Sequence, residues 1–169
     1  MSLAAEVLDA ARARGILIAT AESCTGGLIA AALTEVPGSS DIVDRGFVTY
    51  SNAAKRQMLG VKPATLGAFG AVSEEVAAQM ASGALAHSDA NLAVAVTGIA
   101  GPGGSDHKPE GRVCFGVAIV SGGTGPEVVT ETVEFGAIGR HRVRAATVDR
   151  ALRLLLLHLG QRRTQDADG

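Results

Sequence analysis

The sequence predicts an α/β domain: a three-layer α/β/α sandwich in which helices cover both faces of a mixed, mostly parallel sheet. Short apolar runs of strand length alternate along the chain with longer segments of helical periodicity. The 169 residues are 47% apolar but only 3% aromatic, so the core must be built from Ala, Val, Leu and Ile. Helices packed closely on a sheet suit such a core, and a terminal β-hairpin followed by a long helix completes the prediction.

The first third of the chain predicts two helices and two strands. Residues 3–14 carry apolar side chains at the spacing of one helix face, and the glycine after them ends this helix. Residues 16–21 form a short apolar run typical of a buried strand. A helix over residues 25–35 stops before a Pro-Gly pair, and the aromatic and β-branched residues of 46–50 indicate a second strand.

The middle of the chain predicts three helices. Ser51 or Asn52 is expected to cap a helix over residues 53–59. Residues 63–69 begin with a proline, which favours the first turn of a helix. A third helix begins after a serine and keeps one face apolar over residues 73–87.

The next segments predict a central strand and a hairpin. Residues 92–96 are continuously apolar, as in a strand covered on both faces. Residues 97–111 are rich in Gly and Pro and predict a loop. A glycine-rich turn joins the strands predicted for 113–120 and 128–135, and Glu131 interrupts the inward face of the second, which places it toward an edge.

The last helix is predicted for residues 140–159, where apolar side chains repeat every three and four positions. No internal repeat or linker is visible, so residues 1–160 are expected to form a single domain. Residues 161–169 are polar and predict a disordered tail.

Composition excludes several classes of function. A net charge of −2 argues against nucleic acid or an anionic membrane as partner. The chain has neither a run of about 18 apolar residues nor a signal peptide, so we expect a cytoplasmic protein. Cys24 and Cys114 fit neither a disulfide framework nor a CxxC metal pair, and we expect no metal and no organic cofactor.

The stretch from Thr20 to Gly27 predicts a strand, a tight turn and the start of a helix. Ser23 follows the strand, and Gly26 and Gly27 leave backbone N–H groups uncovered at the positive end of the helix. Such a turn can hold an anion or a developing oxyanion. The alternative is that Ser23 or Thr25 only caps the helix.

Three strand ends carry small and polar residues that could form one site. They are Glu22-Ser23-Cys24-Thr25, Thr49-Tyr50-Ser51-Asn52 with Lys55, and Thr97-Gly98 with the loop that follows. Ligands of α/β proteins collect at the carboxyl ends of parallel strands. If the three strands are parallel, these ends converge on one crevice.

Two nucleophiles are possible at this crevice. Lys55 lies in the first turn of its helix, where the dipole disfavours its charge, so it could act as a base for Ser23 together with Tyr50. The alternatives are a solvated lysine and a tyrosine used in packing. Cys24 is the rival nucleophile, since a thiol pKa falls at a helix start.

Arginines at the start of the last helix form a further candidate site. Arg140, Arg142 and Arg144 lie at the end of the helix that disfavours cations, unless an anion is nearby. They form either a solvated charged face or a phosphate grip on a nucleotide.

Four stretches occur together and in order: Ala21-Glu22-Ser23-Cys24-Thr25-Gly26-Gly27, Gly46-Phe47-Val48-Thr49-Tyr50-Ser51-Asn52 with Lys55, Gly70-Ala71-Val72-Ser73-Glu74, and Thr97-Gly98-Ile99-Ala100-Gly101-Pro102. In them, the chain resembles the CinA carboxy-terminal domain family, the competence/damage-inducible group that includes the stand-alone nicotinamide-nucleotide amidase. The resemblance extends from Leu3 to about Leu159.

The resemblance implies an anticodon-binding-domain-like fold, a homodimer and hydrolysis of the carboxamide of nicotinamide mononucleotide to nicotinic acid mononucleotide and ammonia. By motif match, Ser23 is the nucleophile and Tyr50 and Lys55 support it. Our hypothesis is that the proton of Ser23 passes to Lys55, either directly or relayed through Tyr50. The expected oxyanion donors are N–H groups near Thr25 to Gly27. The residues expected to bind the nucleotide substrate are Cys24, Thr25, Gly26, Gly27, Thr97, Gly98, Arg140 and Arg144.

Two departures from the family pattern concern substrate fit. The loop over residues 103–111 is one residue shorter than usual, and Gly139 stands where an acidic residue is usual. They favour slightly a non-catalytic nucleotide-binding or regulatory module as the alternative function. An amidase for another small amide is a third possibility.

Overall fold

The polypeptide alternates helices and strands along most of its length, as predicted. The structure, a computed structural model, describes residues 1–105, 107–120, 122–123 and 125–167, with side chains as far as Gly160. In chain order, the elements are α1 (Leu3–Arg12), β1 (Ile18–Glu22), α2 (Leu28–Thr34), the 3₁₀ helix η1 (Ser39–Asp41), β2 (Val43–Val48), α3 (Asn52–Leu59), α4 (Pro63–Phe69), α5 (Glu74–Ala86), β3 (Leu92–Gly98), β4 (Arg112–Val120), β5 (Pro126–Glu134) and α6 (Arg140–Ala167).

The sheet is mixed and has the strand order β2-β1-β3-β4-β5. β1 pairs in parallel with both β2 and β3, whereas β4 is antiparallel to β3 and β5 is antiparallel to β4. Within the described sheet, β4 alone runs in the opposite direction, so the predicted mixed, mostly parallel sheet is confirmed. β5 lies at an edge, as the position of Glu131 predicts. Ser121 and Thr124 of the predicted turn lie outside the described residues.

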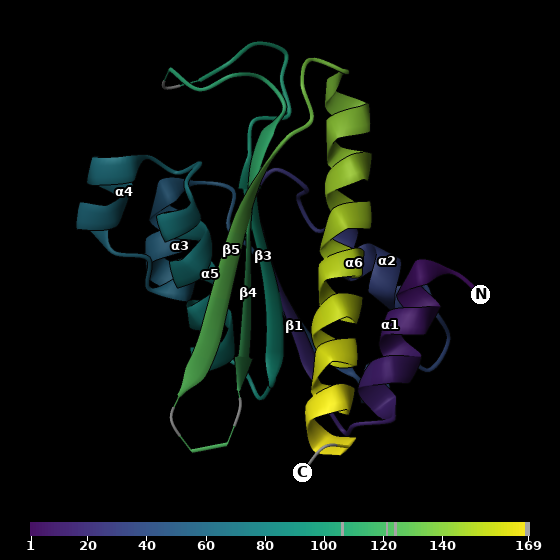
Figure 1. Ribbon diagram of the computed structural model, residues 1–169. Helices are drawn as coiled ribbons and strands as arrows, with labels where there is room; N and C mark the ends of the chain where they lie inside the picture. The colour runs from purple at the N-terminus through teal and green to yellow at the C-terminus, as the bar shows by residue number, and fades with distance from the viewer. Residues whose placement is uncertain (106, 121, 124, 168–169) are drawn as a thin grey trace.

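Helices cover both faces of the sheet and give the predicted three layers (Figure 1). α3, α4 and α5 lie on one face, and α1, α2 and α6 lie on the other. The core under α1, α2 and α6 is built from Leu, Ile and Val with one buried phenylalanine, Phe115. The core under α5 is rich in alanine, which both the sheet and the helix contribute.

Small residues let α5 approach the sheet and its neighbouring helix closely. A methyl group at Gly116 of β4 would lie 2.5 Å from the backbone oxygen of Ala77, and one at Gly83 would lie 2.0 Å from that of Leu59. Both distances are far below van der Waals contact, so these positions require glycine. This close packing is how a chain with few aromatic residues fills its core.

Serine side chains cap two helices that border the site. Ser51 Oγ accepts a hydrogen bond from the N–H of Ala54 at the start of α3, and Ser73 Oγ accepts one from Val76 at the start of α5. Of the two caps predicted for α3, the structure therefore has Ser51.

Helix α6 continues to Ala167, beyond its predicted end near Leu159. Gly160 lies within it; a helical glycine costs only about 1 kcal/mol relative to alanine, and no proline follows to stop the helix. The helix thus enters the predicted tail of residues 161–169, whose side chains and last two residues lie outside the described part. The disorder of that tail stays a prediction.

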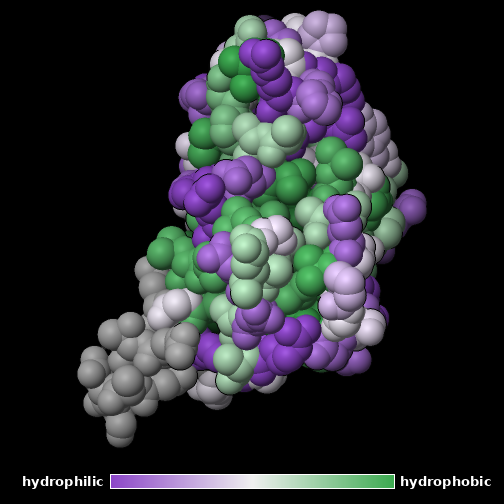
Figure 2. Space-filling model, turned by 90° about the vertical axis from the view of Figure 1, so that its right-hand side faces the viewer, coloured by the Kyte–Doolittle hydropathy of each residue, from purple (hydrophilic) through white to green (hydrophobic). Residues whose placement is uncertain are grey.

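The outer face of α1, α2 and α6 mixes apolar and charged side chains (Figure 2). A groove of about 380 Å³ runs between α2 and α6 and is lined by Leu28, Ala32, Ala145 and Val148 among others. Among the described helices, none combines the length and the apolar character needed to cross a membrane.

Candidate active site

The carboxyl ends of β1, β2 and β3 lie at one edge of the sheet, beside a cavity of about 350 Å³. The three strands are parallel, so the predicted convergence of their ends is observed. The lining residues come from these ends, from the loop after β3, from the α4–α5 link and from α3 and α6. They are Ser23, Cys24, Tyr50, Asn52, Lys55, Ala71, Val72, Thr97, Gly98, Ile99, Ala100, Gly101, Pro102, Gly103, Gly104, Ser105, Lys108 and Arg140.

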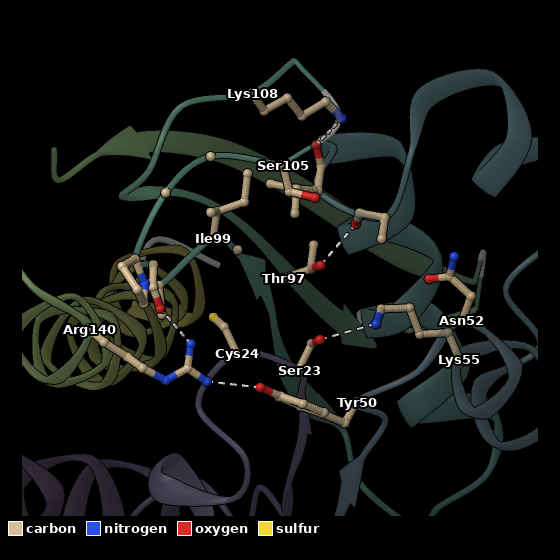
Figure 3. A pocket seen from close by; sticks show the side chains of 18 residues that line it. Ser23, Cys24, Tyr50, Asn52, Lys55, Thr97, Ile99, Ser105, Lys108 and Arg140 are labelled. Carbon is tan, nitrogen blue, oxygen red and sulfur yellow. Dashed lines mark hydrogen bonds between the residues drawn. The ribbon is translucent and has the colours of Figure 1, made fainter. Parts of the chain in front are cut away.

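Ser23 and Lys55 are in direct hydrogen-bond contact in this cavity (Figure 3). Lys55 Nζ donates to Ser23 Oγ over 3.0 Å and to the backbone oxygen of Thr49 over 2.9 Å. Lys55 is only 2% exposed and Ser23 8%, so the alternative of a solvated surface lysine is wrong. The Lys55 amine and the Ser23 hydroxyl are therefore in direct contact, with no bridging side chain between them.

Burial lowers the pKa of Lys55 below its ordinary value of 10.5, because desolvation penalises the ammonium form. Among the described residues, no carboxylate is hydrogen-bonded to this amine to offset that penalty. Lys55 also lies close to the N-terminus of α3, where the helix dipole disfavours a positive charge. The amine is therefore poised to accept a proton from Ser23.

Glu22, the last residue of β1, is fully buried and holds the turn that carries Ser23. One carboxylate oxygen accepts hydrogen bonds from the Thr25 hydroxyl and the N–H of Ile29, and the other accepts from the N–H of Ala30. Its negative charge interacts favourably with the N-terminus of α2.

The backbone of Glu22 also links the Ser23 turn to Thr49, the residue whose carbonyl holds Lys55. Its oxygen accepts a 2.8 Å hydrogen bond from the N–H of Thr49, whose own oxygen accepts from Lys55 Nζ. Sequence reasoning assigned Glu22 no role. The available signal was a carboxylate at the end of an apolar run, directly before a glycine-rich helix start.

The predicted cap of α2 is wrong. The N-cap residue is Gly27, with φ +108° and no side-chain cap, while Thr25 bonds to Glu22 and Ser23 to Lys55. Thr25, Gly26 and Gly27 do not belong to the residues that line the cavity. Their place is behind Ser23, where they shape the turn.

Cys24 lines the cavity, but its thiol is buried. Burial raises the pKa of Cys24 to about 12, with a smaller contribution from the nearby charge of Glu22. The sequence predicted a fall in this pKa at the helix start, and that prediction is wrong. Desolvation outweighs the helix terminus here, and the N–H groups of Ile29 and Ala30 are already bonded to Glu22.

Tyr50 and Arg140 meet at the rim of the cavity (Figure 3). Arg140 donates to the hydroxyl of Tyr50 over 2.9 Å and to the backbone oxygen of Gly101 over 2.8 Å. Tyr50 is 62% exposed, so it is not a core residue. Its hydroxyl lies on Arg140 rather than between Ser23 and Lys55, and the predicted relay is absent from this arrangement of described side chains.

The other predicted residues divide between the cavity and the turn. Thr97 and Gly98 line the cavity, and the Thr97 hydroxyl donates to the backbone oxygen of Ala71 over 2.8 Å. Arg144 does not line it; its guanidinium donates to the backbone oxygens of Cys24 and Thr25. Arg144 thus supports the turn from the side of α6.

Some lining residues were not predicted as site residues. Asn52, Ala71, Val72 and Lys108 come from the start of α3, the α4–α5 link and the tip of the loop. Asn52 belongs to one of the three strand-end stretches, and Ala71 and Val72 belong to a family motif, but none of them was given a role in catalysis or binding. Lys108 carried a signal as a cation in a glycine-rich loop. Among the described residues, no group of three or more His, Cys, Asp and Glu side chains could hold a metal ion.

Comparison with protein families gives one match over nearly the whole chain. The model of the CinA C-terminal domain matches residues 1–159. This match agrees with the resemblance stated from the four motifs.

Curated relatives fall into two groups. A CinA-like protein of Chlorobium phaeobacteroides is 59% identical over 119 residues, which cover 70% of this chain but only 28% of that protein. This chain thus spans little more than a quarter of that longer relative. The nicotinamide-nucleotide amidohydrolase PncC of Escherichia coli K12 is 53% identical over 123 residues, which cover 72% of this chain and 74% of that one.

Solved structures share the fold. A competence/damage inducible protein of Agrobacterium tumefaciens superposes with a TM-score of 0.87 at 53% identity, covering 94% of this chain and 93% of that chain. A CinA superfamily protein of Escherichia coli gives 0.82 at 36% identity, covering 92% and 90%.

Proposed function

The chain belongs to the CinA C-terminal domain family, and we propose that it hydrolyses the carboxamide of nicotinamide mononucleotide to nicotinic acid mononucleotide and ammonia. The observation that carries this proposal is the 3.0 Å contact between Lys55 Nζ and Ser23 Oγ beside a cavity of substrate size. Relatives named nicotinamide-nucleotide amidohydrolase, at 53% and 56% identity, support the substrate.

In the first step, the neutral amine of Lys55 accepts the hydroxyl proton of Ser23 while Ser23 Oγ bonds to the carboxamide carbon. The resulting tetrahedral intermediate collapses, the carbon–nitrogen bond breaks, and Lys55 returns the proton to the leaving amine, which departs as ammonia. Thr49 holds Lys55 in place through its backbone oxygen. The product of this step is an ester between Ser23 and the nicotinoyl group.

In the second step, water attacks the ester carbon and gives a proton to Lys55. The carbon–oxygen bond to Ser23 then breaks, Ser23 recovers its proton from Lys55, and nicotinic acid mononucleotide leaves. The same amine serves as base and acid in both steps, so the cycle needs no histidine.

The oxyanion of both intermediates requires N–H donors near Ser23. In the turn, the N–H of Gly26 already bonds to the oxygen of Ser23, and that of Leu28 bonds to Thr25. We therefore place the oxyanion against the N–H group of Cys24, which lines the cavity. This moves the donor toward Ser23 from the predicted range of Thr25 to Gly27.

Arg140 is the residue we propose for the phosphate of the nucleotide. It lies at the rim, and its two present acceptors, Tyr50 and Gly101, are a neutral hydroxyl and a backbone carbonyl. A phosphate dianion is a stronger acceptor than either of them. Arg144 is the weaker candidate, because its guanidinium is bonded to the turn.

Ammonia release from nicotinamide mononucleotide tests the proposal. We expect Ser23→Ala to lower kcat at least about 1,000-fold, because the acyl-enzyme cannot form. Cys24→Ala is the matched control at the adjacent position, and we expect it to keep kcat within about tenfold because its thiol stays protonated. Wild-type turnover by Ser23→Ala, with loss of turnover on alkylation of Cys24, would assign the chemistry to Cys24.

A non-catalytic nucleotide-binding module is the competing function. Calorimetric titration of the wild-type protein with nicotinamide mononucleotide, beside the ammonia assay, separates the two. Tight binding with no ammonia would support the module and contradict the amidase. Turnover of nicotinamide or its riboside at the same rate as the nucleotide would contradict the role of Arg140.

A further inference from the structure

Lys108 joins two walls of the cavity that are far apart in the sequence. Its Nζ donates hydrogen bonds to the backbone oxygens of Phe69, the last residue of α4, and Val72, in the link to α5. Figure 3 shows Lys108 on the side of the cavity away from Tyr50 and Arg140. The structure thus directs this loop cation onto the protein's own backbone.

The acceptor side is built to receive an ammonium group. Gly70 lies between the two acceptors with φ +78°, and a methyl group there would come within 3.1 Å of Lys108 Nζ. The remaining carbonyls of the segment bond to other side chains: that of Gly70 to Ser73 Oγ and that of Ala71 to Thr97 Oγ1. The four carbonyls from Phe69 to Val72 thus all accept from side chains, and Lys108 supplies two of these bonds.

The loop that carries Lys108 is braced at its base and at its tip. At its base, the N–H groups of Ile99 and Gly111 bond to Arg112 and Ile99. At its tip, Ser105 and Lys108 exchange backbone hydrogen bonds of 3.1 and 2.8 Å. A tether at the tip adds to these bonds in holding the wall from Ile99 to Ser105.

Lys108 and Val72 also lie between the candidate active-site cavity and a neighbouring cavity. That neighbouring cavity, of about 500 Å³, is lined by Phe69, Ser73, Glu74 and Arg112 among others, and it shares Lys108 and Val72 with the first. The tether therefore forms part of the wall between the two cavities.

We propose that Lys108 is a positioning residue that sets the width of the substrate cavity by clamping the described part of its loop, residues 99–105 and 107–111, onto the α4–α5 link. It acts on substrate binding and not on the chemical step, since it lies away from Ser23 and Lys55. The predicted change in KM rests on the proposed amidase function. The clamp, meaning the contact of Lys108 with the Phe69 and Val72 oxygens, does not depend on that function.

Two variants that break the same contact from opposite sides test the proposal. Lys108→Met keeps nearly the length of the side chain but removes the donor group, and Gly70→Ala places a methyl group 3.1 Å from Nζ, which pushes Nζ away from its acceptors. We expect each to raise KM for nicotinamide mononucleotide about 5- to 20-fold with kcat within about twofold. The double variant should be no worse than the more impaired single variant, because the two act on one contact.

Gly38→Ala is the control for an alanine at positive φ, since Gly38 has φ +83° and open space around the added methyl group. It should leave KM unchanged. Gly70, with φ +78° and ψ +166°, lies in a region open almost only to glycine, so Lys108→Met, which leaves the backbone unchanged, is the decisive variant. A fall in kcat with unchanged KM, no change in either constant, or additive effects in the double variant would each overturn the proposal.

Amide hydrogen exchange keeps the test independent of the amidase function. In Lys108→Met and Gly70→Ala, peptides covering residues 69–73 and 99–111 should exchange faster than in the wild type, while those of β1 and β3 should not change. Unchanged exchange at both segments would overturn the clamp. If the wild-type protein releases no ammonia but the exchange result holds, the proposed function fails and the clamp stands.

Discussion

At the residue level, the candidate site depends on one lysine that is buried next to a hydroxyl. An exposed lysine carries its proton at neutral pH and cannot act as a base. Lys55 is 2% exposed and has only neutral hydrogen-bond acceptors among its described partners, so desolvation lowers its pKa. The residue type alone could not reveal this, because burial depends on how α3 packs against the end of β1.

This burial predicts a pH-dependent stability. In the folded protein the pKa of Lys55 is lowered, so between that value and 10.5 the unfolded state binds more protons. The free energy of unfolding attributable to Lys55 therefore rises with pH in this window, by at most about 1.4 kcal/mol per pH unit. We expect the wild type to gain stability relative to Lys55→Met as the pH rises toward 10.5, as measured by urea denaturation.

The exposed Lys62, at the start of α4, supplies the control for that measurement. The stability difference between the wild type and Lys62→Met should stay flat, because this side chain is solvated in both states. A flat difference for Lys55→Met as well would contradict the burial argument. The rate should follow the same ionisation: kcat/KM should fall as pH drops and Lys55 becomes protonated.

Among elements, α5 is the helix that demands the smallest side chains. It packs on the alanine-rich face of the sheet and against the end of α3, where Gly83 has no space for a Cβ atom. In α4, by contrast, a side chain can be added without a clash, because Gly67 is exposed and has open space around it. The same substitution should therefore have opposite effects in the two helices.

We expect Gly83→Ala to lower the free energy of unfolding by about 2–4 kcal/mol, because the added methyl group meets the backbone of Leu59. Gly67→Ala should raise it by about 0.5–1 kcal/mol, since alanine is the better helix former and restricts the unfolded chain. Chemical denaturation at equilibrium measures both. Equal stability of Gly83→Ala and the wild type would show that α5 does not pack as closely as the structure has it.

For the molecule as a whole, the resemblance predicts a homodimer. Sedimentation velocity over a hundredfold range of concentration should give a species of twice 17.0 kDa, and the melting temperature should rise with concentration as association stabilises the folded state. A single species of 17.0 kDa at every concentration would refute this prediction.

The order of elements, the layers and the meeting of three strand ends could be predicted from the sequence, because each depends on local periodicity and on the rule that parallel strands end together. The pattern of apolar runs identified β1 and β3, and motif matching selected Ser23 and Lys55. Helix boundaries were less well defined: α2 begins at Leu28 with Gly27 as its N-cap rather than Ser23 or Thr25, since the carboxylate of Glu22 accepts from the free N–H groups of the first turn.

The tertiary structure decided how these side chains are partnered and how deeply they are buried. Glu22 lies behind the turn and bonds to the start of α2, and burial raises the pKa of Cys24 instead of lowering it. Tyr50 accepts a hydrogen bond from Arg140, and Lys108 donates to the backbone of the opposite wall. Each of these depends on contacts between segments that are distant along the chain. Desolvation and hydrogen bonding act through such contacts, which local sequence patterns do not record.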